Sequence, residues 1–116
     1  MANKLKGETT LNLANKEYKA RLTINAIMQI EDACNMGVIK LAQNMSEGDI
    51  RLTHIISVLL PALRGGGNDL QEHDVIKIVQ DAGIVKATTA VANLLAQSLT
   101  DDSTEETDEG KQEQGD

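Results

Sequence analysis

The chain has 116 residues and a net charge of −7 at pH 7, and Tyr18 is its sole aromatic residue. Because no run of about 18 apolar residues occurs and no apolar stretch follows the N-terminal lysines, the sequence predicts neither a membrane span nor a signal peptide. Cys34 is the single cysteine, which excludes an internal disulfide and a cysteine-rich metal site. We expect a cytoplasmic protein in which Cys34 is a buried structural thiol.

The net charge lies entirely in the last sixteen residues. Residues 101–116 hold eight of the 18 acidic side chains and one of the 11 basic ones, so residues 1–100 carry ten of each and sum to zero. The acidic segment has no apolar side chain to offset an ordering cost of about 1–2 kcal/mol per residue. The sequence therefore predicts a single domain over residues 1–99 and a disordered acidic tail over residues 100–116, which either aids solubility or shields a binding surface.

Residues 7–23 alternate between apolar and polar side chains, which is typical of a β-hairpin. A two-residue turn at Asn15 and Lys16 would place Leu13 opposite Tyr18 on the apolar side. A four-residue loop is the alternative, because Lys16 does not favour the left-handed conformation. Since an isolated hairpin is marginally stable in water, we expect it to pack on helices.

After Thr23 the apolar residues repeat with a period of about 3.6, which is typical of amphipathic helices. The first helix is expected to be capped by Thr23 or Asn25 and to end in the left-handed conformation at Gly37. Further helices are expected over residues 38–45, 52–64, 72–82 and 85–99. The expected inward-facing residues are Ile24, Ile27, Ile30 and Cys34; Leu52, Ile55, Ile56, Leu59, Leu60 and Leu63; Val75, Ile76 and Val79; and Val91, Leu94, Leu95 and Leu99. The predicted fold class is α+β, with an N-terminal β-hairpin followed by four or five α-helices and mostly helical content.

Three consecutive glycines follow the helix over residues 52–64. The stretch from Arg64 to Asp69 lacks the lysine and the hydroxyl of a phosphate-binding loop, and it follows a helix C-terminus, whose partial charge is negative. It therefore predicts a flexible connector rather than a nucleotide site. Pro61 lacks an amide donor and is expected to weaken or bend the last turn of this helix.

The titratable residues form no catalytic or metal-binding pattern. Neither His54 nor His73 has a second histidine or cysteine at helical spacing to complete a zinc site. Glu31 and Asp32 are adjacent on a helix and point about 100° apart, so they cannot share one proton. We expect no enzyme activity, no cofactor and no metal.

The two helices around Gly83 raise the alternative of a small DNA-binding regulator. A recognition helix needs basic and amide side chains at its start, whereas residues 84–99 offer Lys86, Asn93 and Gln97 only. The acidic tail would also repel nucleic acid. We therefore expect no nucleic-acid partner and keep the regulator as the least favoured alternative.

Four segments together resemble a known family. They are Leu5–Glu8, the hairpin end Tyr18–Thr23, the helix Ile24–Ala33 containing Ile30 and Glu31, and Leu63–Gly67. This order resembles the small tail-assembly chaperones of siphophage-like particles, specifically the gene transfer agent type, which is also labelled a tail tube protein. The resemblance covers about residues 3–99, and Pro61 and the acidic tail depart from it.

The resemblance implies a non-enzymatic protein, in the cytoplasm of a bacterial host, that coats the tape-measure protein and presents it to tail tube subunits. The expected partners are the tape-measure protein and the tail tube protein, without membrane contact, and a homo-oligomer is left open. A structural tail tube or connector subunit associated with the virion is the main alternative. We hypothesise that the partner surface combines the helix over residues 52–63 with the glycine loop, and that the hairpin edge is a second candidate. The hypothesised contact residues are His54, Ser57, Arg64, Gly65, Gly66 and Gly67.

Overall fold

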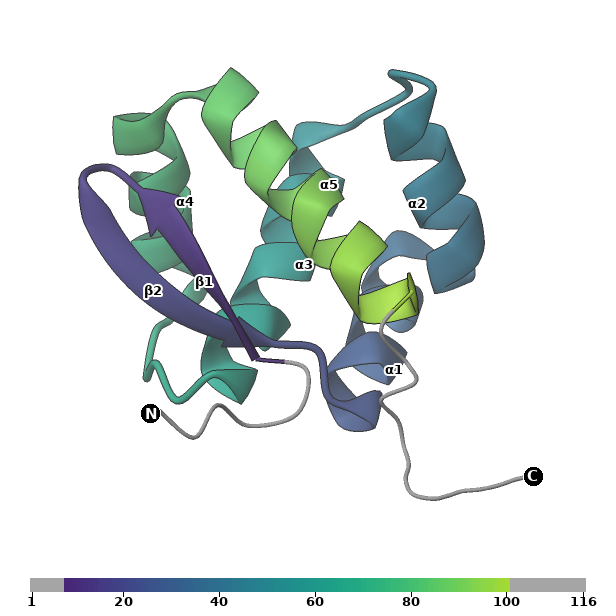
Figure 1. Cartoon of the computed structure of the whole chain (residues 1–116), viewed down its shortest axis with the longest axis horizontal. Helices are drawn as coiled ribbons and strands as arrows, with labels where there is room; N and C mark the ends of the chain where they lie inside the picture. Colours follow the sequence, from purple (N-terminus) through teal and green to yellow (C-terminus); the bar gives the residue numbers. More distant parts are fainter. Residues whose placement is uncertain (1–7, 101–116) are drawn as a thin grey trace.

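The computed structural model describes residues 8–100, which form an antiparallel hairpin followed by five helices (Figure 1). The elements are β1 (Glu8–Leu13), β2 (Lys16–Arg21), α1 (Ile24–Cys34), α2 (Val38–Ser46), α3 (Leu52–Gly65), α4 (Glu72–Ala82) and α5 (Ile84–Thr100). This arrangement confirms the predicted α+β class, with the strands confined to the N-terminal part. The acidic segment over residues 101–116 lies outside the described residues.

The hairpin turn lies one residue earlier than the predicted one. Ala14 and Asn15 both have positive φ, 54° and 65°, as a two-residue turn that follows the twist of the strands requires. Leu13 therefore pairs with Lys16 rather than with Tyr18. The predicted turn is wrong because it would force the long side chain of Lys16 into the left-handed region, which the short side chain of Ala14 occupies instead. The register shifts by two residues, so every side chain stays on its predicted face.

The first helix begins where the sequence predicts and ends earlier. The side chain of Thr23 accepts a hydrogen bond from the backbone N–H of Ala26 at 3.0 Å, which confirms Thr23 as the N-cap. The helix ends at Cys34, and Asn35 takes the left-handed conformation with φ of 56°. The prediction of a left-handed Gly37 is wrong, because asparagine can supply this conformation and comes first in the chain. Gly37 has φ of −67° and precedes α2.

Helix α3 is the centre of the domain, since it packs against α1, β2, α4 and α5 (Figure 1). It continues through Pro61 as far as Gly65. Its buried side chains are Ile55, Val58, Leu59, Ala62 and Leu63, so the inward stripe includes two smaller residues that the prediction left out. The buried core of the described residues contains no polar or charged side chain.

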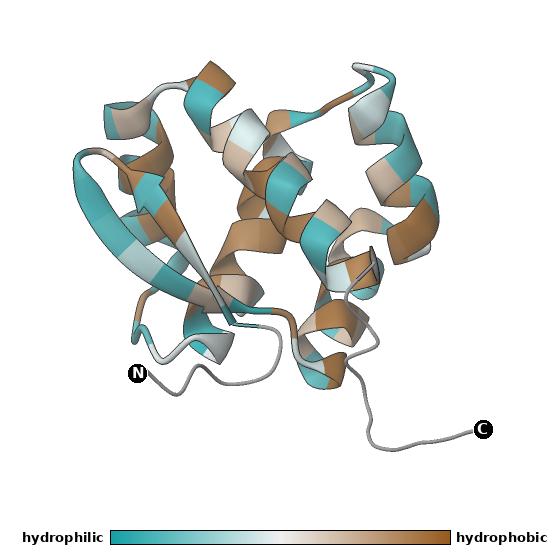
Figure 2. Cartoon of the chain, in the orientation of Figure 1, coloured by the Kyte–Doolittle hydropathy of each residue, from teal (hydrophilic) through white to brown (hydrophobic). Residues whose placement is uncertain are grey.

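Three isoleucine or leucine residues that were expected to face inward are exposed instead. The exposed fractions are 74% for Ile24, 47% for Leu52 and 47% for Ile76. In α4 the buried stripe is Val75, Ile78 and Val79, which leaves Ile76 outside it. Figure 2 shows hydrophobic and hydrophilic positions alternating along the helices.

The end of α3 meets strand β2 at a junction that admits only glycine. A Cβ on Gly66 would overlap the backbone carbonyl oxygen of Lys19, and a Cβ on Gly65 would overlap that of Arg21. Asn68 fixes the same junction, because its Nδ2 donates a hydrogen bond to the Lys19 carbonyl oxygen at 2.7 Å. The prediction of a flexible connector is therefore wrong, since the glycines permit close packing of a helix end on a strand.

We expect Gly66→Ala to lower the free energy of unfolding by about 1–3 kcal/mol, because the strand or the helix must move to admit the methyl group. For a domain of this size each kcal/mol corresponds to a fall in Tm of about 4–8 °C, which thermal unfolding measures. Gly37→Ala is the matched control, because its Cβ would lie 3.8 Å from the Glu31 carboxylate at an ordinary φ. The control should cost less than about 1 kcal/mol. Equal losses in both variants would contradict the steric explanation.

Candidate partner-binding surface

An apolar groove of about 500 Å³ lies between the first half of α3, helix α4 and the start of α5. The five aliphatic side chains that line it are Leu52, Ile56, Ile76, Val79 and Ile84. Its polar lining residues are Thr53, Ser57, Glu72 and Gln80. Such a groove, lined mostly by apolar side chains with a few polar groups, is typical of a binding site.

The groove exposes large aliphatic side chains that the core does not use. Leu52 and Ile76 are each 47% exposed and Ile84 is 60% exposed, and Val85 beside them is 78% exposed. Single exposed aliphatic residues are common on protein surfaces, whereas a cluster from three helices indicates an interaction site.

Glu72 is the one charged residue among those that line the groove. Further along α4, Lys77 and Asp81 lie one turn apart with 3.4 Å between Nζ and the carboxylate oxygen, so these two charges offset each other. The groove therefore combines a mostly aliphatic lining with one negative charge at the first residue of α4. A partner with a basic side chain beside an apolar stripe would complement it.

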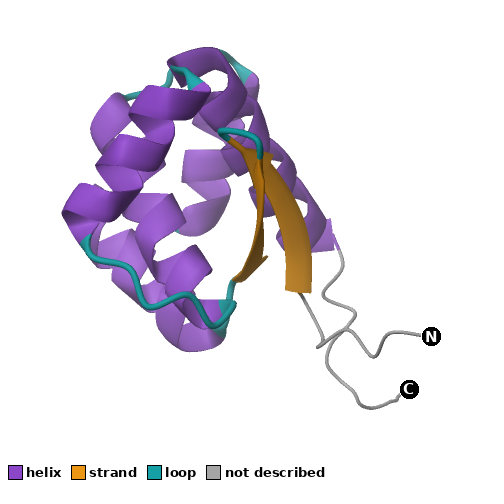
Figure 3. Cartoon of the chain, turned by 90° about the vertical axis from the view of Figure 1, so that its left-hand side faces the viewer, coloured by secondary structure: helices purple, strands orange, loops and turns teal. Residues whose placement is uncertain are grey.

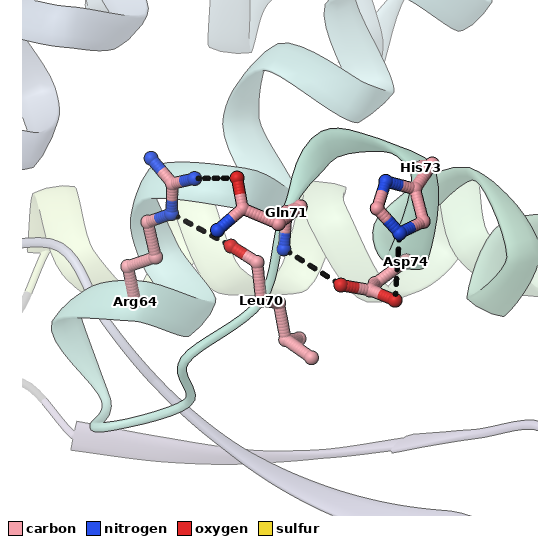
Figure 4. A network of polar contacts seen from close by, with 5 residues as sticks. All are labelled: Arg64, Leu70, Gln71, His73 and Asp74. Atoms are coloured by element: carbon pink, nitrogen blue, oxygen red, sulfur yellow. Dashed lines mark hydrogen bonds and ion pairs between the residues drawn. The ribbon is translucent and has the colours of Figure 1, made fainter.

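A polar network holds the start of α4 in place (Figure 4). The Nε of Arg64 donates to the carbonyl oxygen of Leu70 at 2.8 Å, and its Nη2 lies 3.5 Å from the side-chain oxygen of Gln71. The backbone N–H of Gln71 donates to the Asp74 carboxylate at 2.8 Å, which satisfies a free donor at the helix start. Arg64 thus ties the end of α3 to the beginning of α4 and positions one wall of the groove.

Ser57 links the groove to the interior. Its side chain lines the groove and forms a hydrogen bond with the thiol of Cys34, which is 5% exposed. Burial raises the pKa of the Cys34 thiol, and the hydrogen bond from Ser57 only partly opposes this effect. A raised pKa keeps the thiol protonated and poorly reactive, as expected for a structural cysteine.

His54 lies in a separate and more polar hollow of about 290 Å³. The other lining residues of this hollow are Cys34, Asn35, Met36, Asn44, Asp49 and Arg51. Over residues 8–100, no group of three or more histidine, cysteine or acidic side chains is placed to hold a metal ion. The hollow offers no ligand set that would define a second site.

The six hypothesised contact residues do not form one surface. Ser57 lies in the groove, His54 lies in the polar hollow, and Arg64 and the first two glycines serve the junctions of α3 with β2 and α4. Gly67 has φ of 101° and is exposed, with no heavy atom within 4 Å of its Cβ position.

Sequence reasoning missed the half of the groove that α4 and α5 supply. Ile76 was assigned to the core and Ile84 was assigned no role. The available signal was that Ile76 lies outside the stripe formed by Val75, Ile78 and Val79, on a face that is otherwise polar. Several apolar residues outside such stripes, when they cluster as Leu52, Ile76 and Ile84 do, indicate an interaction surface.

Together the fold and the groove define a small, mostly helical domain with an apolar groove on its surface. A family model described as phage tail tube protein, GTA-gp10, matches residues 6–101. Since the match spans most of the chain, the protein belongs to this family of phage and gene transfer agent tail proteins, which confirms the resemblance noted in the sequence. The searches of curated proteins and of solved structures give no match. No helix within residues 8–100 is both long enough and apolar enough to cross a membrane.

We expect the native protein to resist alkylation at Cys34. Iodoacetamide at pH 8 should modify the native thiol at least about 100-fold more slowly than the thiol of the urea-unfolded chain, because burial both blocks access and raises the pKa. Mass spectrometry of quenched time points measures both rates. Similar rates in the two states would contradict the structural role of Cys34.

Proposed function

We propose that this protein acts in tail assembly by binding a helical segment of another tail protein in the groove between α3, α4 and α5. The observation that carries this proposal is the exposure of Leu52, Ile76 and Ile84 around one apolar hollow. Amphipathic helices bind such grooves through apolar side chains spaced three or four residues apart. Because the charges of residues 1–100 sum to zero, the body exerts no net long-range repulsion on a charged partner, and Glu72 in the groove favours a basic one.

Two forms of this function differ in whether the protein remains in the particle. The family description names a tail tube protein, and it favours a structural subunit of the tube or connector over the chaperone expected from the sequence. The chaperone form, in which the groove holds the tape-measure protein in the host cytoplasm, is supported by the groove itself. A long helical partner would offer many apolar stripes of the kind this groove accepts.

The protein content of purified particles separates the two forms. A tube subunit should be present in many copies per particle, at a molar amount comparable to that of the other tail proteins. A chaperone should be abundant in the lysate during assembly and absent from the purified particle. Quantitative mass spectrometry of both fractions, with the tape-measure protein as internal reference, measures this ratio. A multi-copy component in purified particles would exclude the chaperone form.

We expect Ile84→Glu and Ile76→Glu to weaken binding of the groove's partner at least about 10-fold, because each places a carboxylate in the apolar contact. Pull-down of co-expressed tape-measure and tail tube proteins, followed by titration of the retained one, measures the affinity. Ile39→Glu is the matched control, since Ile39 is 64% exposed on α2 and does not line the groove.

All three substitutions are at exposed positions, so the far-UV circular dichroism and Tm should stay close to those of the unchanged protein. Undiminished retention by both groove variants, with Ile39→Glu equal to them, would remove the groove from consideration. Salt-dependent retention of the protein on duplex DNA would instead favour the regulator alternative.

A further inference from the structure

The two edges of the hairpin carry outward-pointing backbone groups at known positions. In an antiparallel pair joined by a two-residue turn, Leu13 and Lys16 exchange hydrogen bonds, and every second pair does the same. The intervening pairs direct their N–H and C=O groups away from the partner strand. On β1 the outward groups therefore belong to Glu8, Thr10 and Asn12, and on β2 to Glu17, Lys19 and Arg21.

The edge of β2 is covered. The carbonyl oxygen of Lys19 accepts a hydrogen bond from Asn68 Nδ2 at 2.7 Å, and the carbonyl oxygen of Arg21 lies directly against Gly65. Helix α3 packs along this strand. No further strand can add to β2 without displacing the glycine junction.

The edge of β1 is open. Helices α4 and α5 meet this strand through its inner face, where Leu11 and Leu13 are buried. Figure 3 shows the hairpin along one side of the helices, with β1 on the outer side of β2 in this view. Within residues 8–100, the outward backbone groups of Thr10 and Asn12 make no hydrogen bond, and both side chains are exposed.

This edge lacks the features that keep strand edges from pairing. Proteins blunt such edges with lysine, proline, bulges or inward charges. The outward positions at the centre of β1 are instead the uncharged Thr10 and Asn12, while Glu8 is a charged outward residue at the start of the strand. The strand pairs with β2 in unbroken register. The edge is therefore competent to accept another strand.

We propose that β1 pairs antiparallel with β1 of a second copy of this chain, which gives a four-stranded sheet across a twofold axis. With Thr10 opposite Asn12 of the second copy, each Leu11 lies opposite its equivalent and the inner faces remain aligned. Glu8 then lies opposite Ala14 of the second copy, so no like charges meet across the new pair. Residues 1–100 of each copy carry no net charge, so net repulsion between two full chains comes from the acidic residues 101–116.

The covered edge of β2 limits this association to two copies. Because the open edge is used by both molecules in the same way, the interface is isologous and closes on itself. Addition of further copies through the sheet would need β2, which the glycine junction occupies. This inference does not depend on the groove or on the identity of the tail partner.

Analytical ultracentrifugation of the full chain at about 5–500 µM tests the proposal, since this range of concentrations detects a dimer with a micromolar Kd. The expected mass at the upper concentrations is about twice the chain mass of 12.5 kDa. Asn12→Pro should keep the protein monomeric throughout, because it removes an outward N–H from β1 and no bond within the hairpin. Thr10→Pro should have the same effect.

Glu17→Pro is the matched control, because Glu17 lies opposite Asn12 and proline there removes an equivalent outward N–H from the other edge. This variant should form the same dimer as the unchanged chain, and circular dichroism should show native helix content for all three. A monomer at every concentration for the unchanged chain would overturn the proposal. Dimers of Asn12→Pro and Thr10→Pro, or a higher oligomer of the unchanged chain, would overturn it equally.

Discussion

The close approach of the α3 C-terminus to strand β2 is the contact on which the rest of the structure depends. A two-stranded hairpin has too little buried surface to be stable alone, so it must be held on a helix. Gly65 and Gly66 let the helix end reach the strand backbone, and Asn68 completes the contact with a hydrogen bond to Lys19. The same turn carries the chain to Leu70, whose carbonyl group Arg64 holds, and so sets where α4 begins.

This constraint explains how one apolar core supports two different surfaces. The buried face of helix α3 packs against the hairpin and the neighbouring helices. Side chains of α3 outside this face line the groove together with α4 and α5. Both the groove and the open edge of β1 therefore follow from the way α3 packs against β2 and the neighbouring helices. One surface suits a helix and the other suits a strand.

Periodicity in the sequence was sufficient to predict the fold class and the order of the elements. A period of two in residues 7–23 fixes which side chains face the helices, whichever turn joins the strands. The turn itself could not be predicted, because positive φ is unfavourable for both Ala14 and Lys16. Which of the two joins Asn15 in the turn depends on the twist of the packed hairpin. The end of the first helix could not be predicted either, because Asn35 and Gly37 both accept the left-handed conformation that ends a helix and lie two positions apart.

The candidate site was predictable in part. Helix α3 and Ser57 were recognised, but the groove needs α4 and α5, whose positions follow from tertiary packing around Arg64 and the glycine junction. The glycines looked like a connector because a sequence shows conformational freedom and does not show which atoms come close. The steric role of Gly65 and Gly66 becomes evident only when Lys19 and Arg21, more than forty positions earlier in the chain, are known to lie beside them.

The position of Tyr18 has a practical consequence for spectroscopy. It is the sole aromatic residue of the chain and lies on β2 opposite Leu11, partly buried against the core. All tyrosine fluorescence and nearly all near-ultraviolet absorbance and circular dichroism of the protein therefore originate at the interface of hairpin and helices. A melt followed at these wavelengths monitors the release of the hairpin, whereas one followed in the far ultraviolet monitors the five helices. The hairpin and the helices thus have separate spectroscopic signals in the unmodified protein.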